Sequence, residues 1–225
     1  MRLEVGRIRF EYSIQPPISS LQPPKMLRTQ TFPMPGTRAR ARVGSTARRV
    51  QRLQGMPVAQ RILGVDPGLH ITGYGVIELV ARNRVLEPQL VEGGTVRARE
   101  SDALPLRLQT LFDGLSEVLR EHNPDVVVIE ELFSTYAHPR SALLMAHARG
   151  VLMLAAQIHN VPVHGFTPNE VKQVVAGNGH ATKSNVQAAV KTRLKLASAP
   201  HPPDVADALA IALCFAARQN LDSKQ

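Results

Sequence analysis

The chain has 225 residues, of which 44% are hydrophobic and 20% are charged. These fractions are close to the averages of globular proteins, so they exclude a chain that is disordered throughout. The formal net charge of +9 is concentrated in residues 1–60, which hold 11 of the 27 Lys and Arg and 2 of the 18 Asp and Glu. Residues 61–225 therefore carry no net charge, and the basic pI describes the N-terminal segment alone.

Residues 1–60 contain 7 of the 17 prolines and no sustained period of a helix or a strand. Such a segment cannot bury enough apolar surface to offset the entropy of ordering it, so it predicts a basic, Pro-rich disordered extension. Three interpretations compete: an arm that binds DNA nonspecifically, an Arg-rich organelle transit peptide, and a start-site artefact. We favour the artefact, with an internal start such as Met56, shortly before the first predicted strand.

The cysteine content and the hydropathy of the chain argue against disulfide-bonded and membrane-spanning proteins. The single cysteine, Cys214, cannot form an internal disulfide and lies in an apolar run, so we expect a small buried core residue in a reducing compartment. The histidines show no metal-ligand spacing. The longest uncharged apolar run, Val151 to Ile158, is shorter than the roughly 20 residues that span a bilayer, which predicts a soluble protein.

The folded part begins with a predicted meander. Three apolar segments joined by short turns predict antiparallel strands over residues 61–66, 71–80 and 91–96. Leucines at helical spacing then predict a helix over 104–122. The nearly all-apolar run from Asp125 to Glu130 is typical of a central strand that is buried on both faces.

The second half alternates between helices and strands. We expect a long Ala- and Leu-rich helix over 140–159 and a strand over 161–166. A capping box from Thr167 to Glu170 opens the next helix, and two more helices are predicted over 183–196 and 204–218. The pattern indicates one α/β domain over 61–225, built on a mixed sheet of about five strands flanked by helices.

Several carboxylates occupy positions where charge is costly. Asp66 and Glu130 each end an apolar strand, and Asp204 and Asp207 share one face at the start of an apolar helix. Each has an ordinary alternative role: a turn former at Asp66, the entry to a solvated loop at Glu130, and a helix cap at Asp204. Four clustered acids without basic partners would not all stay ionised, and a divalent cation resolves that conflict.

The ligand chemistry favours a hard metal. Carboxylate oxygens alone suit Mg²⁺ or Mn²⁺ better than Zn²⁺. Two such ions about 4 Å apart can activate a water and stabilise the leaving oxygen of a phosphodiester. The positive end of the last helix also favours ionised Asp204 and Asp207. We therefore predict Asp66, Glu130, Asp204 and Asp207 as both metal ligands and catalytic residues.

Four separated motifs resemble the RuvC family of Holliday junction resolvases. They are ILGVDPGLHITGYGVIE, VVIEELF, EVKQVVAGNGHATKSNVQ and DVADALAIAL, in that order, and the resemblance covers about residues 61–219. It implies a ribonuclease-H-like fold and a homodimeric crossover junction endodeoxyribonuclease that cuts four-way DNA junctions by symmetric nicks, with two Mg²⁺ (Mn²⁺ as a substitute). It also implies action with the RuvA and RuvB branch-migration proteins, in recombination and DNA repair in the bacterial cytoplasm.

The resemblance also assigns roles to residues. Asp66 and Glu130 match the first two acids of the family, and Asp204 and Asp207 match its closing pair. Some relatives carry His at the position of Asp204, so the all-carboxylate set here strengthens the expectation of a hard metal. Phe133 matches an aromatic that stacks on bases near the junction centre.

Further DNA contacts are expected around these acids. Lys172 and Lys183 match basic residues near the scissile phosphate, although Lys172 alone also fits a solvated helix face. We add Arg140 and Arg149 as phosphate contacts without a motif, and Tyr136 as a second stacking candidate.

Dimerisation is expected through one helix. A junction with near two-fold symmetry needs two active sites related by a dyad. Small residues in the predicted helix 140–159 permit close packing, which makes it our candidate dimer element; they are Ala142, Ala146, Ala148 and Gly150.

Two other functions are compatible with parts of the sequence. The turn after Asp66 also resembles the phosphate-binding turn of actin- and hexokinase-like ATPases, but a second such domain would not fit in this chain. A module that binds junctions without cutting them is the other alternative, and the presence of all four acids gives it no support.

Overall fold

The computed structural model describes residues 60–82, 85–132 and 139–222. The predicted extension falls almost entirely outside these ranges, so its disorder and its proposed start-site origin remain predictions. The described residues form an α/β domain, and the predicted domain boundary at residue 61 stays a prediction.

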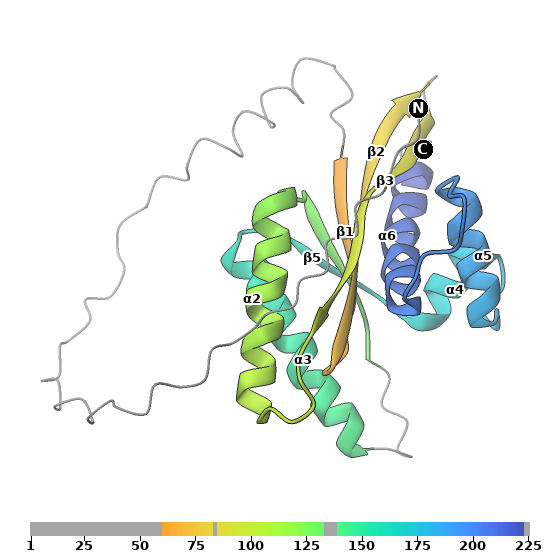
Figure 1. Ribbon diagram of the computed structural model, residues 1–225. Coiled ribbons are helices and arrows are strands. Elements are labelled where there is room, and N and C mark those ends of the chain that lie inside the picture. The colour runs from red at the N-terminus through yellow and green to blue at the C-terminus, as the bar shows by residue number, and fades with distance from the viewer. Residues whose placement is uncertain (1–59, 83–84, 133–138, 223–225) are drawn as a thin grey trace, which may run out of the picture. The chain divides into compact units, whose positions relative to one another are not determined.

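The domain is built on one five-stranded mixed sheet (Figure 1). Its strands are β1 (Gln60–Asp66), β2 (Ile71–Arg82), β3 (Val85–Arg97), β4 (Val126–Glu130) and β5 (Val163–Phe166), in the order β3-β2-β1-β4-β5. The first three pair antiparallel, as the predicted meander requires, whereas β4 lies parallel to β1 and β5 parallel to β4. The mixed sheet confirms the predicted fold class.

Helices cover both faces of this sheet (Figure 1). One face carries α2 (Leu104–His122) and α3 (Pro139–Ile158), and the other carries α4 (Pro168–Ala176), α5 (Lys183–Arg193) and α6 (Pro203–Asp222). This arrangement agrees with the ribonuclease-H-like architecture that the motifs imply.

Local signals fix several helix ends as predicted. The Thr167 side chain accepts a hydrogen bond from the Glu170 backbone N–H, and the Glu170 carboxylate accepts one from the Thr167 backbone N–H, which completes the capping box of α4. Asn123 ends α2 in the left-handed conformation (φ 44°), and its N–H bonds to the carbonyl of Leu119. Cys214 is fully buried in α6, as expected.

Several elements differ from their predicted bounds, and β3 and α5 show the physical reasons most clearly. β3 begins at Val85 rather than residue 91, because it is an edge strand and an edge strand tolerates Pro88 within the ladder. α5 ends at Arg193 rather than residue 196, since Lys195 has a positive φ of 55° that an α-helix cannot contain.

Side chains of the central strands alternate between two separate cores. Ile62 of β1 and Val128 of β4 pack with α4, α5 and α6. Leu63 and Val65 of β1 point the opposite way and pack with α2 and α3. The four residues Val126 to Ile129 of β4 are buried, which explains why they are all apolar.

Four glycines line the part of the sheet that lies beneath α6, and we call them the glycine floor: Gly64, Gly73, Gly75 and Gly93. A Cβ at Gly64 would collide with the backbone carbonyl of Ala208, and one at Gly73 would collide with the carbonyl of Asp204. A Cβ at Gly75 would lie 2.5 Å from the Leu209 side chain, and one at Gly93 2.7 Å from Val205. The absence of side chains at these positions brings the backbone of α6 directly onto the sheet.

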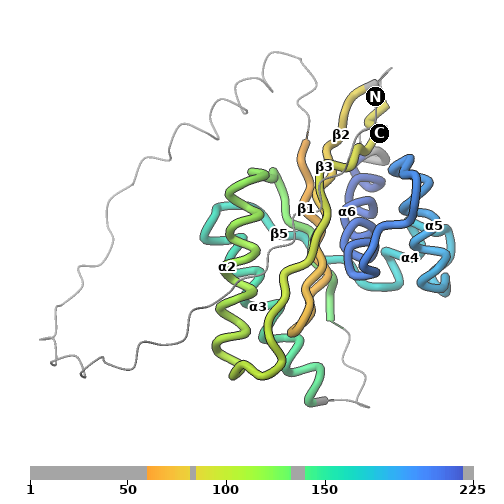
Figure 2. The backbone as a smooth tube through the Cα atoms, in the orientation of Figure 1, coloured from red at the N-terminus to blue at the C-terminus, as the bar shows by residue number. Residues whose placement is uncertain are grey.

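Helix α3 packs against α2 (Figure 2) but keeps a large apolar surface exposed. Its stretch Arg140–Ile158 is long and apolar enough to cross a membrane by length and composition, and 22% of it is buried. The apolar-run criterion used on the sequence excluded such a helix, because Arg149 interrupts the run. The same helix places Ala148, Leu152 and Ala155 fully in the core beside α2.

Candidate functional site

The site begins with two acids at the ends of neighbouring parallel strands. β1 and β4 run in register from the Ile62–Val126 pair to the Val65–Ile129 pair, so Asp66 and Glu130 follow at the same level. Adjacent strands lie about 4.8 Å apart. Each acid continues the alternation that turns residues 62 and 128 toward α6, and the two carboxylates therefore share the α6 face.

Helix α6 brings the second pair of acids to that face. Asp204 lies in its first turn and Asp207 one turn further, and both are partly buried. Gly73 pairs with Asp66 across β1 and β2, and it is the residue whose missing Cβ admits the backbone of Asp204. The glycine floor is therefore what allows the start of α6 to approach Asp66.

The acids also affect one another's ionisation. Burial first, and then the charges of Glu130, Asp207 and Asp204 in that order, raise the pKa of Asp66 to about 7. Burial, followed by the charge of Asp207, likewise raises the pKa of Glu130. A carboxylate loses ionisation when it is desolvated beside like charges. The cluster is therefore an electrostatically strained site that favours a proton or a cation.

Two lysines that the sequence selected lie beside the acids. The Lys183 ammonium lies 3.5 Å from a carboxylate oxygen of Asp207, although the Lys183 side chain is 81% exposed. Its charge lowers the pKa of both Asp66 and Glu130, and Lys172 lowers that of Glu130. Lys172 is half-buried on α4, and Lys183 lies at the start of α5. The structure thus brings both lysines to the same acid cluster.

The donor set fits a hard divalent cation. The four acids offer only carboxylate oxygens, and two of them have raised pKa values from burial and mutual repulsion. A divalent ion neutralises such a set, and oxygen-only ligation suits Mg²⁺ or Mn²⁺. The chain therefore carries a carboxylate cluster that is compatible with divalent metal binding.

The other residues predicted to contact DNA do not all lie at the acid cluster. The Arg149 guanidinium donates from Nε to the backbone carbonyl of Glu130 at 3.0 Å and contacts the Met153 sulfur, so it supports the end of β4. Arg140 is exposed at the start of α3. Phe133 and Tyr136 lie outside the described residues, and their stacking roles remain predictions.

Sequence reasoning missed a second group of ligand-type side chains. Glu92 on β3, with Glu121 and His122 at the end of α2, brings ligand atoms within 4.8 Å of one another on the α2/α3 face. The histidines show no metal-ligand spacing in the sequence, and spacing alone does not detect this contact. No short-range spacing could have revealed it, because Glu92 reaches His122 only through the packing of α2 on β3.

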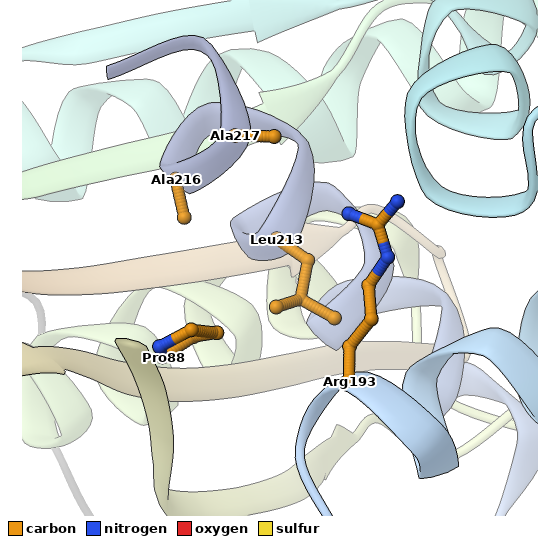
Figure 3. Close-up of a pocket in the computed structure, with 5 residues that line it drawn as sticks. All are labelled: Pro88, Arg193, Leu213, Ala216 and Ala217. Carbon is orange, nitrogen blue, oxygen red and sulfur yellow. The ribbon is translucent and has the colours of Figure 1, made fainter. Parts of the chain in front are cut away.

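A pocket elsewhere on the domain does not contribute to the acid site. It has a volume of about 240 Å³ and lies between β3, α5 and α6, with Pro88, Arg193, Leu213, Ala216 and Ala217 around it (Figure 3). Ala216 follows Asp204 by twelve residues, which is about 18 Å along a helix. Arg193 is held by the carbonyl of Val174, so the pocket lacks converging polar groups for chemistry.

Comparisons with known proteins match the same part of the chain. The family model described as "Crossover junction endodeoxyribonuclease RuvC" matches residues 62–215. A relative from Rhodopirellula baltica with that name is 51% identical over 156 residues, which are 69% of this chain and 85% of the relative. A second, from Alkaliphilus oremlandii, is 46% identical over 69% of this chain and 92% of its own length.

Solved structures agree in fold and family. The structure of Thermus thermophilus RuvC is 34% identical and superposes with a TM-score of 0.66, covering 72% of this chain and 97% of its own. T. thermophilus RuvC in complex with a Holliday junction substrate gives the same TM-score of 0.66 at 33% identity, covering 73% of this chain and 97% of its own. The ribonuclease-H-like resolvase fold is thereby confirmed.

Proposed function

Because the chain belongs to the RuvC family of crossover junction endodeoxyribonucleases, we propose that it resolves Holliday junctions by paired symmetric nicks during homologous recombination and DNA repair. The observation that carries the proposal is the coupling of four carboxylates on the α6 face, at the ends of β1 and β4. Family membership supplies the substrate class, and the acid cluster supplies the chemistry that cleavage of a phosphodiester needs.

The proposed cofactor is Mg²⁺, with two ions per subunit and Mn²⁺ as a substitute. Asp66, Glu130, Asp204 and Asp207 would hold these ions. Bound there, they supply charge stabilisation at the scissile phosphate and lower the pKa of a water nucleophile. The side chains themselves must be ionised to bind them, and the raised pKa of Asp66, about 7, makes that step depend on pH near neutrality.

The lysines would balance charge around the DNA backbone. Lys183 lies at the edge of the acid cluster and is mostly exposed, so its ammonium can reach a phosphate while it also restrains Asp207. Lys172 adds positive charge on the side of Glu130. Arg140 is exposed and suited to a phosphate contact, whereas Arg149 orients the end of β4 from beneath. We keep Phe133 as the proposed base-stacking residue.

We also propose that the chain acts as a homodimer through α3. Leu143, Leu154 and Ile158 are exposed by 65%, 52% and 56%, and they fall on one side of the helix. Gly150 lies between them with open space around it. Such a stripe buries well against a second copy of itself. Of the small residues predicted for this contact, Ala148 instead lies in the core, and Ala146 is exposed.

The proposed partners follow from the family and from the symmetry of the reaction. Two-fold symmetric nicking requires the four-way junction itself, and the RuvC neighbour solved with a Holliday junction supports that substrate. RuvA and RuvB, and a location in the bacterial cytoplasm, are proposed from the same resemblance.

A junction-cleavage assay tests the function. The full chain is mixed with a synthetic four-way junction and, separately, with a linear duplex of the same sequence, with Mg²⁺ or with chelator. We expect Mg²⁺-dependent nicks at matching positions of two opposite strands, and no cut in the linear duplex. Junction binding without nicks under all metal conditions would favour a non-catalytic binding module, and ATP hydrolysis measured alongside would favour the ATPase alternative.

A further inference from the structure

The group of Glu92, Glu121 and His122 lies apart from the acid site. Alternation along β3 and β2 turns Glu92 to the face of Tyr74 and Val76, which pack in the α2/α3 core. Asp66 and Glu130 belong to the opposite face, beneath α6. The two groups of ligand-type side chains are therefore separated by the sheet.

His122 is the buried member of this group. The residue is 7% exposed, and its Nε2 atom has no hydrogen-bond partner among the described residues. That nitrogen points into the group, since it lies 3.3 Å from the Oε2 atom of Glu92. A buried imidazole nitrogen that lacks a hydrogen bond is costly unless something satisfies it.

The two glutamates are arranged as ligands rather than as a surface pair. The Tyr74 hydroxyl donates to Oε1 of Glu92 at 2.7 Å, which leaves Oε2 turned toward His122. Glu121 adds an exposed carboxylate within 4.8 Å of both other ligand atoms. A hydrogen bond that orients a ligating carboxylate is a common feature around protein-bound metals.

The surrounding charge is negative. Burial raises the pKa of Tyr74, and its hydrogen bond to Glu92 and the charges of Glu92, Glu121 and Glu117 raise it further. The C-terminal end of α2 adds its own partial negative charge beside Glu121 and His122. Two arginines also lie close by. Arg61 donates to Glu78 and to the backbone carbonyl of His122, and Arg120 donates from Nε to the backbone carbonyl of Ser116.

We propose that Glu92, Glu121 and His122 form a second metal site, separate from the catalytic acids, that takes a first-row transition ion of the Zn²⁺ type. One imidazole and two carboxylates suit such an ion better than Mg²⁺, whose preferred ligands are oxygen alone. The ion would join the end of α2 to the edge strand β3. Its role would be to stabilise the fold, since a ligand that binds only the native state raises the free energy of unfolding.

Zinc binding is tested in a variant in which two acids of the catalytic cluster are removed, so that this cluster cannot account for the bound ion. The full chain with Asp66→Asn and Asp207→Asn serves as background, and ZnCl₂ is titrated by calorimetry. Zinc K-edge absorption of the loaded protein then reports imidazole ligation, which an all-carboxylate site cannot give. We expect one Zn²⁺ per chain with one imidazole ligand, and a higher Tm in its presence.

Three substitutions in that background assign the ligands. Glu121→Gln, at an exposed position that tolerates the change, should weaken Zn²⁺ binding at least about tenfold. His122→Gln should remove the imidazole signal. Glu117→Gln, one turn earlier on α2, is the matched control and should retain the background affinity.

Three outcomes would overturn the proposal. They are no Zn²⁺ binding to the background, equal affinities for the Glu121 and Glu117 variants, and an imidazole signal that persists in folded His122→Gln. Absence of binding would leave His122 and Glu92 as a simple ion pair. None of these results depends on junction cleavage. Failure of the zinc proposal can therefore be distinguished from failure of the proposed function.

Discussion

The two faces of the sheet are built in opposite ways. On the α6 face, β1, β2 and β3 present glycines, and the backbone of α6 lies directly on them. On the α2/α3 face, the same strands present large side chains such as Leu63, Tyr74 and Val76, which hold their helices away from the sheet. The acid cluster lies where the helix is closest.

This difference accounts for the position of the acid cluster on the α6 face. Asp204 and Asp207 are helix residues and reach the strand acids because no side chain at Gly64 or Gly73 intervenes. The pKa values of Asp66 and Glu130 are raised mainly because both carboxyl groups are buried, and then because like charges lie beside them. The α2/α3 face instead provides a second apolar core and the exposed stripe on α3.

The largest contrast between the faces is expected from isosteric acid substitutions. Asp66→Asn, Glu130→Gln and Asp207→Asn should each lower the single-turnover cleavage rate by about a thousandfold, or about 4 kcal/mol, because each removes a metal-binding charge. Junction binding, measured by gel shift, should stay nearly unchanged, since basic groups hold the DNA.

Glu78→Gln is the matched control on the opposite face. Glu78 forms an ion pair with Arg61 at 3.0 Å on the α2/α3 side of β2, so its loss should leave the cleavage rate within a few-fold of wild type. Equal losses of cleavage and binding in the acid variants would mean that these acids support the fold.

The next largest effect on cleavage is expected from a side chain added to the glycine floor. Gly73→Ala should push the start of α6 from the sheet, lower the free energy of unfolding by about 1–3 kcal/mol and slow cleavage. Urea unfolding and cleavage by the folded fraction measure the two effects. Gly179→Ala is the control, because an added Cβ there has its nearest neighbour at 3.6 Å. Normal cleavage by Gly73→Ala would show that the floor does not position the acids.

The raised pKa of Asp66 predicts a pH dependence of stability on the α6 face. Between about pH 4 and 7 the native state holds a proton that the unfolded state has released, so this group's contribution to stability falls as pH rises through that window. In chelator, Asp66→Asn should therefore gain in Tm relative to wild type from pH 4 to 7, with no further gain above. A constant difference across the range would place Asp66 in ordinary solvent.

The smallest effect is expected from Lys183. Because Lys183 is largely exposed beside Asp207, Lys183→Ala should slow cleavage several-fold and reduce the salt dependence of binding by about one phosphate contact. Lys195→Ala, which removes an exposed ion pair with Glu87, is the control. Identical rates for the two variants at low salt would exclude a role for Lys183.

Sequence patterns predicted the elements and the acids, but not the features that depend on packing. The apolar run ending in Glu130 and the capping box at Thr167 are local signals, and both lie as expected. The length of β3 was missed, because a proline is permitted only once the strand is known to be an edge. The glycine floor and the approach of Glu92 to His122 arise from contacts between distant elements, which no local period encodes.

An anomalous-scattering map of crystals containing Mn²⁺ would test the acid site most directly, because it locates the ions on either face of the sheet. We expect strong peaks among the carboxylates of Asp66, Glu130, Asp204 and Asp207, and loss of these peaks in Asp66→Asn crystals. Manganese found only near Glu92 and His122, or at no site beside Asp66 under conditions that support cleavage, would contradict the assignment of the α6 face as the catalytic metal centre.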